Sequence, residues 1–170
     1  GKKVKTDSLK RSLKEGDRVI FPFFFPCMSC YNCIKGEFGA CKYRSRIPYQ
    51  DFKYCNSGYS QYFILRSPHF IFHSPKSLND EALVSLNCAL AQVVEAFNFG
   101  KINFGDNVVI QGAGALGIYA TSVARSMGAN EVIVIDGHES RLKLAEKCGA
   151  SKTINISHLQ SSKERIDFIN

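Results

Sequence analysis

The sequence predicts an α/β fold, in which a β-rich N-terminal part precedes the first half of a doubly wound parallel sheet. Three observations support this fold. Residues 108–136 have the pattern of strand, glycine-rich turn, helix and second strand, and another apolar run follows at residues 153–156. Upstream, the chain has only short strand-like runs and a cluster of four cysteines. Strands that alternate with helices are typical of a parallel sheet.

Length and composition set the broad class. A chain of 170 residues with 45% hydrophobic residues forms one globular domain or two small ones. We identify no apolar run long enough for a transmembrane helix, and no apolar segment of a signal peptide near the N-terminus. Seven cysteines, an odd number, fit a reducing compartment better than a disulfide framework. We therefore expect a cytoplasmic protein without a membrane partner.

The net charge of +7 raises the possibility of a nucleic-acid partner. Residues 1–18 contain seven basic and three acidic residues, so they account for +4 of that charge. The rest is scattered, for example at Arg125, Lys143 and Lys147, and no nucleic-acid-binding motif is present. We interpret the charge as a solvated basic surface and expect no nucleic-acid partner.

The first strand is expected at Val19-Ile20, delivered by a turn at Gly16-Asp17. The apolar residues 21–25 lie between this strand and the cysteines, and prolines nearby indicate a packed loop. Partial alternation predicts a second strand over residues 58–65, and a shorter one follows over residues 70–72 before Pro75.

Four cysteines form the first informative motif. Cys27, Cys30, Cys33 and Cys41 have the spacing C-x2-C-x2-C-x7-C. Four thiolates on a short loop match the tetrahedral preference of zinc, and they leave no coordination position open to water. The motif therefore predicts a closed, structural zinc site.

Three other interpretations of these cysteines compete with zinc. The first, chance clustering, is improbable for four of seven cysteines within fifteen residues. Disulfides would close strained small loops and are disfavoured in a reducing compartment. An iron–sulfur cluster uses similar ligands, but the bacterial ferredoxin run has a different fourth spacing and a proline where Lys42 stands here. Cys55 and Cys148 have no partner at ligand spacing, so we interpret both as small buried hydrophobic residues.

A helix is expected to begin at Asn79-Asp80-Glu81. The apolar stretch over residues 82–97 is interrupted by Asn87-Cys88, which indicates helix, turn and second helix. A turn at residues 104–107 then leads into the next strand.

The second informative motif is the run Gly112-Ala113-Gly114-Ala115-Leu116-Gly117 between strand and helix. In such a unit Gly112 permits a tight turn, Gly114 lets the backbone approach a pyrophosphate, and Gly117 lets the helix pack on the strand. The second strand ends at Asp136, whose carboxylate can accept hydrogen bonds from ribose hydroxyls. The motif predicts dinucleotide binding, and a carboxylate at this position favours NAD over NADP.

The helix that follows the glycines is expected to bury Leu116, Ala120, Val123 and Met127 on one face. Another helix is expected over residues 141–147, with Gly149 just beyond its end. Residues 153–156 then form the third strand.

In this order and at this separation, the two motifs resemble the zinc-dependent medium-chain alcohol dehydrogenases. That family has GDRV, here residues 16–19, before its four-cysteine lobe, and a cysteine about two dozen residues before GxGxxG. Here Cys88 precedes Gly112 by 24 residues. The resemblance implies a partial GroES-like catalytic domain over residues 1–87 with the zinc lobe at 27–41. It implies a partial NAD-binding Rossmann domain over residues 88–170.

The resemblance also implies roles for individual residues. Cys88 would be one ligand of a second, catalytic zinc, and Arg141 would lie near the adenosine. The metal ligands implied are Cys27, Cys30, Cys33, Cys41 and Cys88. The implied cofactor-binding residues are Gly112, Gly114, Ala115, Leu116, Gly117, Asp136 and Arg141. The substrate would be a small alcohol or carbonyl compound, and the whole enzyme would be a homodimer or homotetramer.

The sequence departs from the family pattern in three respects. Residues 1–26 contain neither cysteine nor histidine, so the other catalytic-zinc ligands are missing. Gln92 stands where the family usually has threonine, four residues beyond Cys88. About three strands of a six-stranded nucleotide domain are present. We therefore expect these residues to be the central part of a longer enzyme, without turnover by themselves.

Two alternatives to an alcohol or polyol dehydrogenase stay open. A quinone or enoyl reductase of the same superfamily would usually lack the four-cysteine lobe and would prefer NADPH. A non-enzymatic zinc-ribbon module would agree with the basic N-terminus, but not with the order of the motifs.

Overall fold

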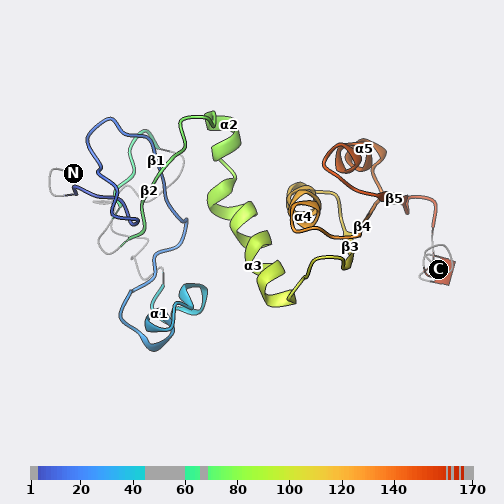
Figure 1. Cartoon of the computed structure of the whole chain (residues 1–170), viewed down its shortest axis with the longest axis horizontal. Helices are drawn as coiled ribbons and strands as arrows, with labels where there is room; N and C mark the ends of the chain where they lie inside the picture. The colour runs from blue at the N-terminus through green and yellow to red at the C-terminus, as the bar shows by residue number, and fades with distance from the viewer. Residues whose placement is uncertain are drawn as a thin grey trace. The chain divides into compact units, whose positions relative to one another are not determined.

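The computed structural model describes residues 4–44, 60–65, 69–159, 161, 163–164 and 166. The chain divides into two compact units, residues 1–87 and residues 88–170. Figure 1 labels the α-helices and β-strands along the chain. In order they are β1 (Val19–Ile20), α1 (Tyr31–Ile34), η1 (Phe38–Ala40), β2 (Phe72–His73), α2 (Asp80–Leu83), η2 (Leu86–Leu90), α3 (Ala91–Gly100), β3 (Asn107–Gln111), α4 (Ala115–Ser126), β4 (Glu131–Asp136), α5 (Glu139–Lys147) and β5 (Lys152–Asn155).

The first unit contains an antiparallel pair, in which Val19 of β1 lies opposite His73 of β2. Asp7 ties the N-terminal loop to this pair, because its carboxylate accepts hydrogen bonds from the backbone N–H groups of Arg11 and His73. The guanidinium of Arg11 completes the tie with an ion pair of 2.6 Å. The carboxylate of Asp7 is buried, and these donors satisfy it.

The strand expected over residues 58–65 is not found where it can be checked. Residues 60–65 contain no strand, and residues 58 and 59 lie outside the described residues. Partial alternation creates a strand only when a neighbouring strand accepts its backbone hydrogen bonds, and the pattern says nothing about that neighbour. The strand expected at residues 70–72 is displaced to Phe72–His73, where β1 provides the partner.

The helix start at Asn79 is confirmed, since its side chain accepts a hydrogen bond of 2.9 Å from the N–H of Ala82. The turn expected at Asn87-Cys88 lies earlier, at Val84 and Ser85, between α2 and η2. At Asn87-Cys88 itself the chain is helical, because the π-helix η2 includes both residues and leads directly into α3. A π turn holds one more residue than an α turn, so it absorbs a pair with poor helix propensity while keeping the backbone hydrogen-bonded.

Continuity of this helix also corrects the expectation about membrane spans. Among the described residues, the 21-residue run Asp80–Gly100 is long and apolar enough to cross a membrane by length and composition, with a mean hydropathy of 1.4. The core helix of a water-soluble protein passes the same test when it is mostly buried, whereas 11% of this apolar window is buried. Val93 and Phe97 of this helix are buried in the core of the second unit.

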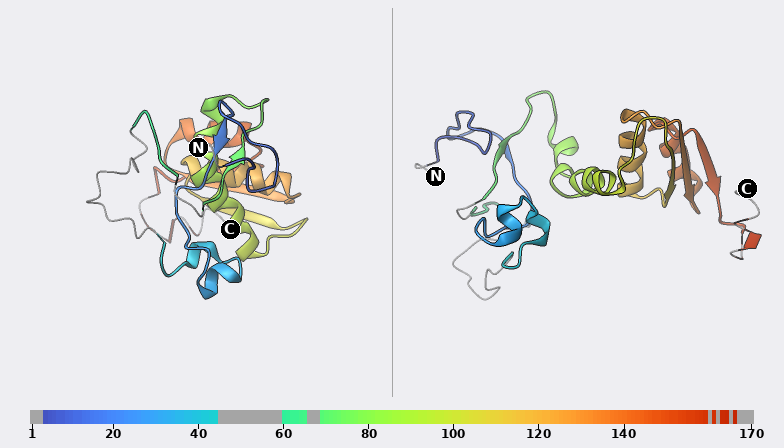
Figure 2. Two further views of the ribbon diagram at one scale, coloured as in Figure 1. Left: turned by 90° about the vertical axis from the view of Figure 1, so that its left-hand side faces the viewer. Right: turned by 60° about the horizontal axis from the view of Figure 1, so that its bottom comes forward.

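The second unit has a three-stranded parallel sheet in the order β3-β4-β5. The strands lie side by side in Figure 2. Helix α4 packs against β3 and β4, α5 packs against β4 and β5, and the two helices contact each other. Both helices therefore cover the same face of the sheet. This crossover of parallel strands and helices confirms the α/β fold expected from the glycine-rich unit.

The core lies between this face and the helices. Val108 and Ile110 of β3 stand beside Val132 and Val134 of β4, and all four are buried. Val109, which points to the opposite face, is 58% exposed. Strict alternation thus gives β3 one covered face and one exposed face, whereas in the neighbouring β4 Ile135 is buried on the second face as well.

The face that α4 buries differs from the expected one. Leu116 and Met127 are 49% and 37% exposed, whereas the helix buries Gly117, Thr121 and Ala124. Ala120 and Val123 are partly buried at the margin of the core. Small side chains let the helix axis approach the sheet closely, so the line of small residues faces the sheet in place of the larger ones.

Candidate nucleotide and metal sites

The glycine-rich turn joins the end of β3 to the start of α4. Gly112 has a φ of +98°, which only glycine adopts without strain, and its N–H donates to the carbonyl of Ile135 at 2.7 Å. The turn thus begins with one more rung of the β3–β4 ladder and then leaves the sheet plane.

Gly117 allows the helix to lie directly on this turn. A Cβ atom at Gly117 would stand 1.8 Å from the carbonyl oxygen of Gly112, so no larger residue fits. Gly114 differs, because a Cβ there would meet no protein atom within 4 Å. Packing therefore explains Gly117 but leaves Gly114 unexplained. The open space beside Gly114 is the expected place for a ligand that approaches the backbone.

The first turn of α4 presents backbone donors. Gly114 is the N-cap. The N–H groups of Ala115, Leu116 and Gly117 lie in the first turn, where an α-helix offers no carbonyl of its own to accept them. The first intrahelical bond runs from Ile118 to Gly114 at 2.9 Å. Donors at the positive end of a 12-residue helix form a suitable site for a phosphate.

Asp136 closes the turn from the end of β4. Its Oδ2 accepts the N–H of Ala113 at 2.7 Å, and its Oδ1 accepts the N–H of His138 at 2.7 Å. The hydrogen bond from Ala113 is the main reason that the pKa of Asp136 is lowered, and the positive charge of Arg141 acts in the same direction. Asp136 is therefore an anion at neutral pH. Arg141 is exposed in the first turn of α5.

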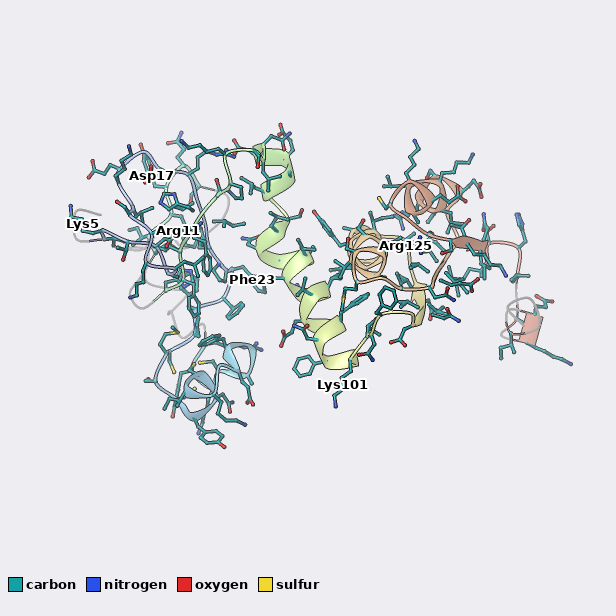
Figure 3. All side chains as sticks on the ribbon, viewed as in Figure 1. Lys5, Arg11, Asp17, Phe23, Lys101 and Arg125 are labelled. Carbon is teal, nitrogen blue, oxygen red and sulfur yellow. The ribbon has the colours of Figure 1, made fainter. Side chains whose placement is uncertain are left out.

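The four clustered cysteines come together around α1 and η1. Their sulfur atoms lie within 4.8 Å of one another, and they gather beside α1 in Figure 3. Two pairs, Cys27 with Cys33 and Cys30 with Cys41, have Sγ···Sγ distances of 3.9 Å. A tetrahedron with Zn–S bonds of about 2.3 Å has edges of about 3.8 Å. The cluster therefore fits a four-thiolate zinc site.

Hydrogen bonds and burial shift the pKa values of these thiols in opposite directions. The backbone and hydroxyl of Ser29 lower the pKa of Cys27 to about 6. Burial raises the pKa of Cys33 to about 12, and the neighbouring sulfur atoms add to the effect. Four thiolates at these distances repel one another, so a divalent cation is required to hold all of them deprotonated.

Met28, between the first two cysteines, has a left-handed backbone with φ of 60°. This conformation costs a residue with a side chain about 1–2 kcal/mol. It allows the N–H of Cys30 to reach the sulfur of Cys27 at 3.3 Å. The loop around the cysteines thus contains backbone strain that metal binding can offset.

Cys88 lies in the π-helix η2. Its sulfur accepts a hydrogen bond of 3.1 Å from Nε2 of Gln92, one turn further along the helix. Among the described residues the four clustered cysteines form the one group with three or more candidate metal ligands, and Cys88 is not a member of it. Cys148 is half-buried, and Cys55 lies outside the described residues.

Sequence reasoning missed three features of these sites. The bonds from Ala113 and His138 to Asp136 come from backbone atoms, which leave no trace in residue types. The contact between Gln92 and Cys88 could have been found, because residues four apart on a helix face each other.

The comparisons with known proteins agree with this arrangement. A family profile described as zinc-binding dehydrogenase matches residues 115–169. Over 150 residues the chain is 32% identical to L-threonine 3-dehydrogenase of Pseudoalteromonas translucida, covering 87% of this chain and 41% of that protein. It is 31% identical to sorbitol dehydrogenase of Bombyx mori, covering 99% of this chain and 47% of that protein.

Solved structures give the same picture. An alcohol dehydrogenase of Thermotoga maritima is similar with a TM-score of 0.86 and 32% identity, over 97% of this chain and 47% of that chain. Galactitol-1-phosphate dehydrogenase of Escherichia coli is similar with a TM-score of 0.75 and 26% identity, over 92% of this chain and 43% of that chain. The chain thus spans less than half the length of the relatives it matches.

Proposed function

The chain belongs to the zinc-dependent medium-chain dehydrogenase family, and we propose that the protein is an NAD-dependent alcohol or polyol dehydrogenase. One observation carries the proposal. The same chain combines a four-sulfur cluster of tetrahedral dimensions with a glycine turn that a buried carboxylate closes. Relatives named for threonine, sorbitol and alcohol oxidation support this class of substrate.

In this proposal residues 1–87 belong to the catalytic domain and residues 88–170 to the nucleotide domain. The turn from Gly112 to Gly117 would accept the pyrophosphate through the N–H groups at the start of α4. Asp136 would accept hydrogen bonds from the adenosine ribose, and Arg141 would lie beside the adenosine. NAD supplies a hydride acceptor, and these residues bind and orient it.

Two metal roles follow from the family. Cys27, Cys30, Cys33 and Cys41 would hold a structural zinc that fixes residues 27–41 as a folded lobe. Cys88 would be a ligand of a catalytic zinc, which when bound supplies Lewis acidity to an alcohol oxygen. Among the described residues Cys88 does not belong to a group of three or more candidate ligands.

The substrate is a small alcohol or carbonyl compound. The same proposal places the whole protein in the cytoplasm and assembles it into a homodimer or homotetramer. A quinone or enoyl reductase is the second candidate. The four-sulfur cluster and the anionic Asp136 disfavour it, because a carboxylate repels the 2′-phosphate of NADP.

Calorimetric titration of the chain with NAD⁺ and NADP⁺ tests the cofactor, and metal analysis tests the zinc. We expect tighter binding of NAD⁺ and one zinc ion bound per chain through the four-cysteine cluster. Tighter binding of NADP⁺ would favour the reductase. A chain that bound zinc but neither nucleotide would favour the zinc-ribbon module.

A further inference from the structure

Asp136 has a structural role in the glycine turn that its expected contact with ribose does not require. Ala113 is 2% exposed, so its N–H group needs an acceptor within the protein. The carboxylate of Asp136, from the neighbouring strand, provides it at 2.7 Å. The side chain of Asp136 thus accepts the hydrogen bond that a backbone carbonyl would accept if the β3–β4 pairing continued to Ala113.

The sheet itself cannot provide this acceptor. Gly112 makes the last backbone bond of the β3–β4 ladder, to Ile135, and its positive φ then turns the chain away. The carbonyl of Asp136 is already used, because it accepts the N–H of Ile156 beyond β5 at 3.1 Å. Since Asp136 is also held by the N–H of His138, its carboxylate is fixed from two sides.

We propose that Asp136 is a positioning residue for the glycine turn: by holding Ala113, its carboxylate aims the N–H groups at the start of α4 toward the pyrophosphate. This proposal rests on the proposed binding of NAD at this turn. Each carboxylate oxygen has two lone pairs and uses one of them for a backbone N–H. The second lone pair of each oxygen stays available to the sugar, so Asp136 serves both roles at once.

Contact with the ribose and positioning of the turn predict different affinities, after removal of Asp136, for a ligand without sugar hydroxyls. If Asp136 acts on the ribose alone, its removal leaves the affinity for 2′,3′-dideoxy-ADP unchanged. The affinity could even rise, because a negative charge near the phosphates is lost. If Asp136 positions the turn, its removal lowers the affinity for this ligand as well.

The test compares Asp136→Ala and Asp136→Asn with the unchanged chain, using ADP and 2′,3′-dideoxy-ADP in calorimetric titrations. We expect Asp136→Ala to bind 2′,3′-dideoxy-ADP roughly tenfold more weakly, as for the loss of one hydrogen bond to a charged group. Its affinity for ADP should fall further, because ADP also loses the contact between its ribose and the carboxylate. Asp136→Asn should show a smaller loss, because its carbonyl oxygen can still accept from Ala113. If Asp136→Ala bound 2′,3′-dideoxy-ADP as tightly as the unchanged chain does, the proposal would be overturned.

Asp106→Ala is the matched control. Its carboxylate accepts the N–H of Asn103 at 2.7 Å, just before β3 and thus at the other end of that strand from the glycine turn. It should lose a similar bond and charge without a change in nucleotide affinity. Equal losses in Asp106→Ala and Asp136→Ala would overturn the proposal, because general destabilisation would then explain both.

Hydrogen exchange at the amide of Ala113 provides a readout that needs no nucleotide. We expect strong protection in the unchanged chain and at least tenfold faster exchange in Asp136→Ala, with unchanged protection in β4. If the unchanged chain bound neither ligand, the proposed function would fail. Equal exchange rates at Ala113 in the unchanged chain and in Asp136→Ala would instead refute the positioning role of Asp136. The two failures are therefore distinguishable.

Discussion

Replacing Gly117 by alanine separates packing from binding at the glycine turn. The new Cβ would stand 1.8 Å from the carbonyl oxygen of Gly112, where ordinary contacts require more than 3 Å. The obstacle is backbone, so the helix has to move away from the strand. Overpacking of this kind costs about 3 kcal/mol or somewhat more. Alanine in a helix returns about 1 kcal/mol relative to glycine, which leaves a net loss of about 2 kcal/mol.

Gly114→Ala is the matched comparison, since its Cβ meets no protein atom within 4 Å and its φ is −73°. Its loss of stability should not exceed about 1 kcal/mol, the difference between glycine and alanine at an N-cap. Its affinity for NAD⁺ should nevertheless fall at least tenfold, because the methyl group occupies the space left for the pyrophosphate.

The assay is thermal and denaturant unfolding of each chain, followed by titration with NAD⁺. A net loss of about 2 kcal/mol lowers the melting temperature of a unit of this size by roughly 8–16 °C. A Gly117→Ala chain as stable as the original would refute the packing argument. A Gly114→Ala chain with unchanged affinity would refute the assignment of its open space to a ligand.

Three further predictions concern the cysteine cluster and Asp136. Cys33→Ser should abolish stoichiometric zinc binding in a metal analysis and raise hydrogen exchange over residues 27–41. The control Cys148→Ser should leave the zinc content and the exchange unchanged. Zinc retained in Cys33→Ser would contradict the four-cysteine site. Met28→Gly should raise zinc affinity by up to roughly fivefold in a competition titration by relieving left-handed strain, whereas Lys10→Gly, equally left-handed but outside the cluster, should not. Because the folded-state pKa of Asp136 is lowered, its stabilising effect is complete above about pH 4 and is lost as the pH falls through that folded-state pKa. The difference in unfolding free energy between the original chain and Asp136→Ala should therefore be constant near neutral pH and shrink in acid, and a difference that grows in acid would reverse this reasoning.

The parallel strands and the zinc cluster could be predicted because local chemistry specifies them. Four cysteines within fifteen residues are close in any compact loop, and glycines at fixed spacing admit one type of turn. The prediction of a strand over residues 58–65 is not confirmed at residues 60–65, because a strand depends on a partner from elsewhere in the chain, which the sequence pattern does not identify.

The helices show a second limit of sequence reasoning. Asn87-Cys88 has the composition of a turn, yet hydrogen bonding continues through a π segment there. Leu116 has the apolar character of a core residue, yet Gly117 faces the sheet because only glycine fits against Gly112. Propensity and hydrophobicity describe single residues, whereas both outcomes depend on the shape of the surrounding backbone.

The spacing of the metal ligands has a consequence for the order of events during synthesis. Cys27, Cys30 and Cys33 emerge within seven residues, and Cys41 follows eight residues later. Closing loops this short costs little chain entropy, so zinc capture does not depend on any distant segment. The lobe can therefore mature on the ribosome well before the glycine turn has been translated, and a cell short of zinc would leave this lobe unfolded while the nucleotide-binding turn is still being made.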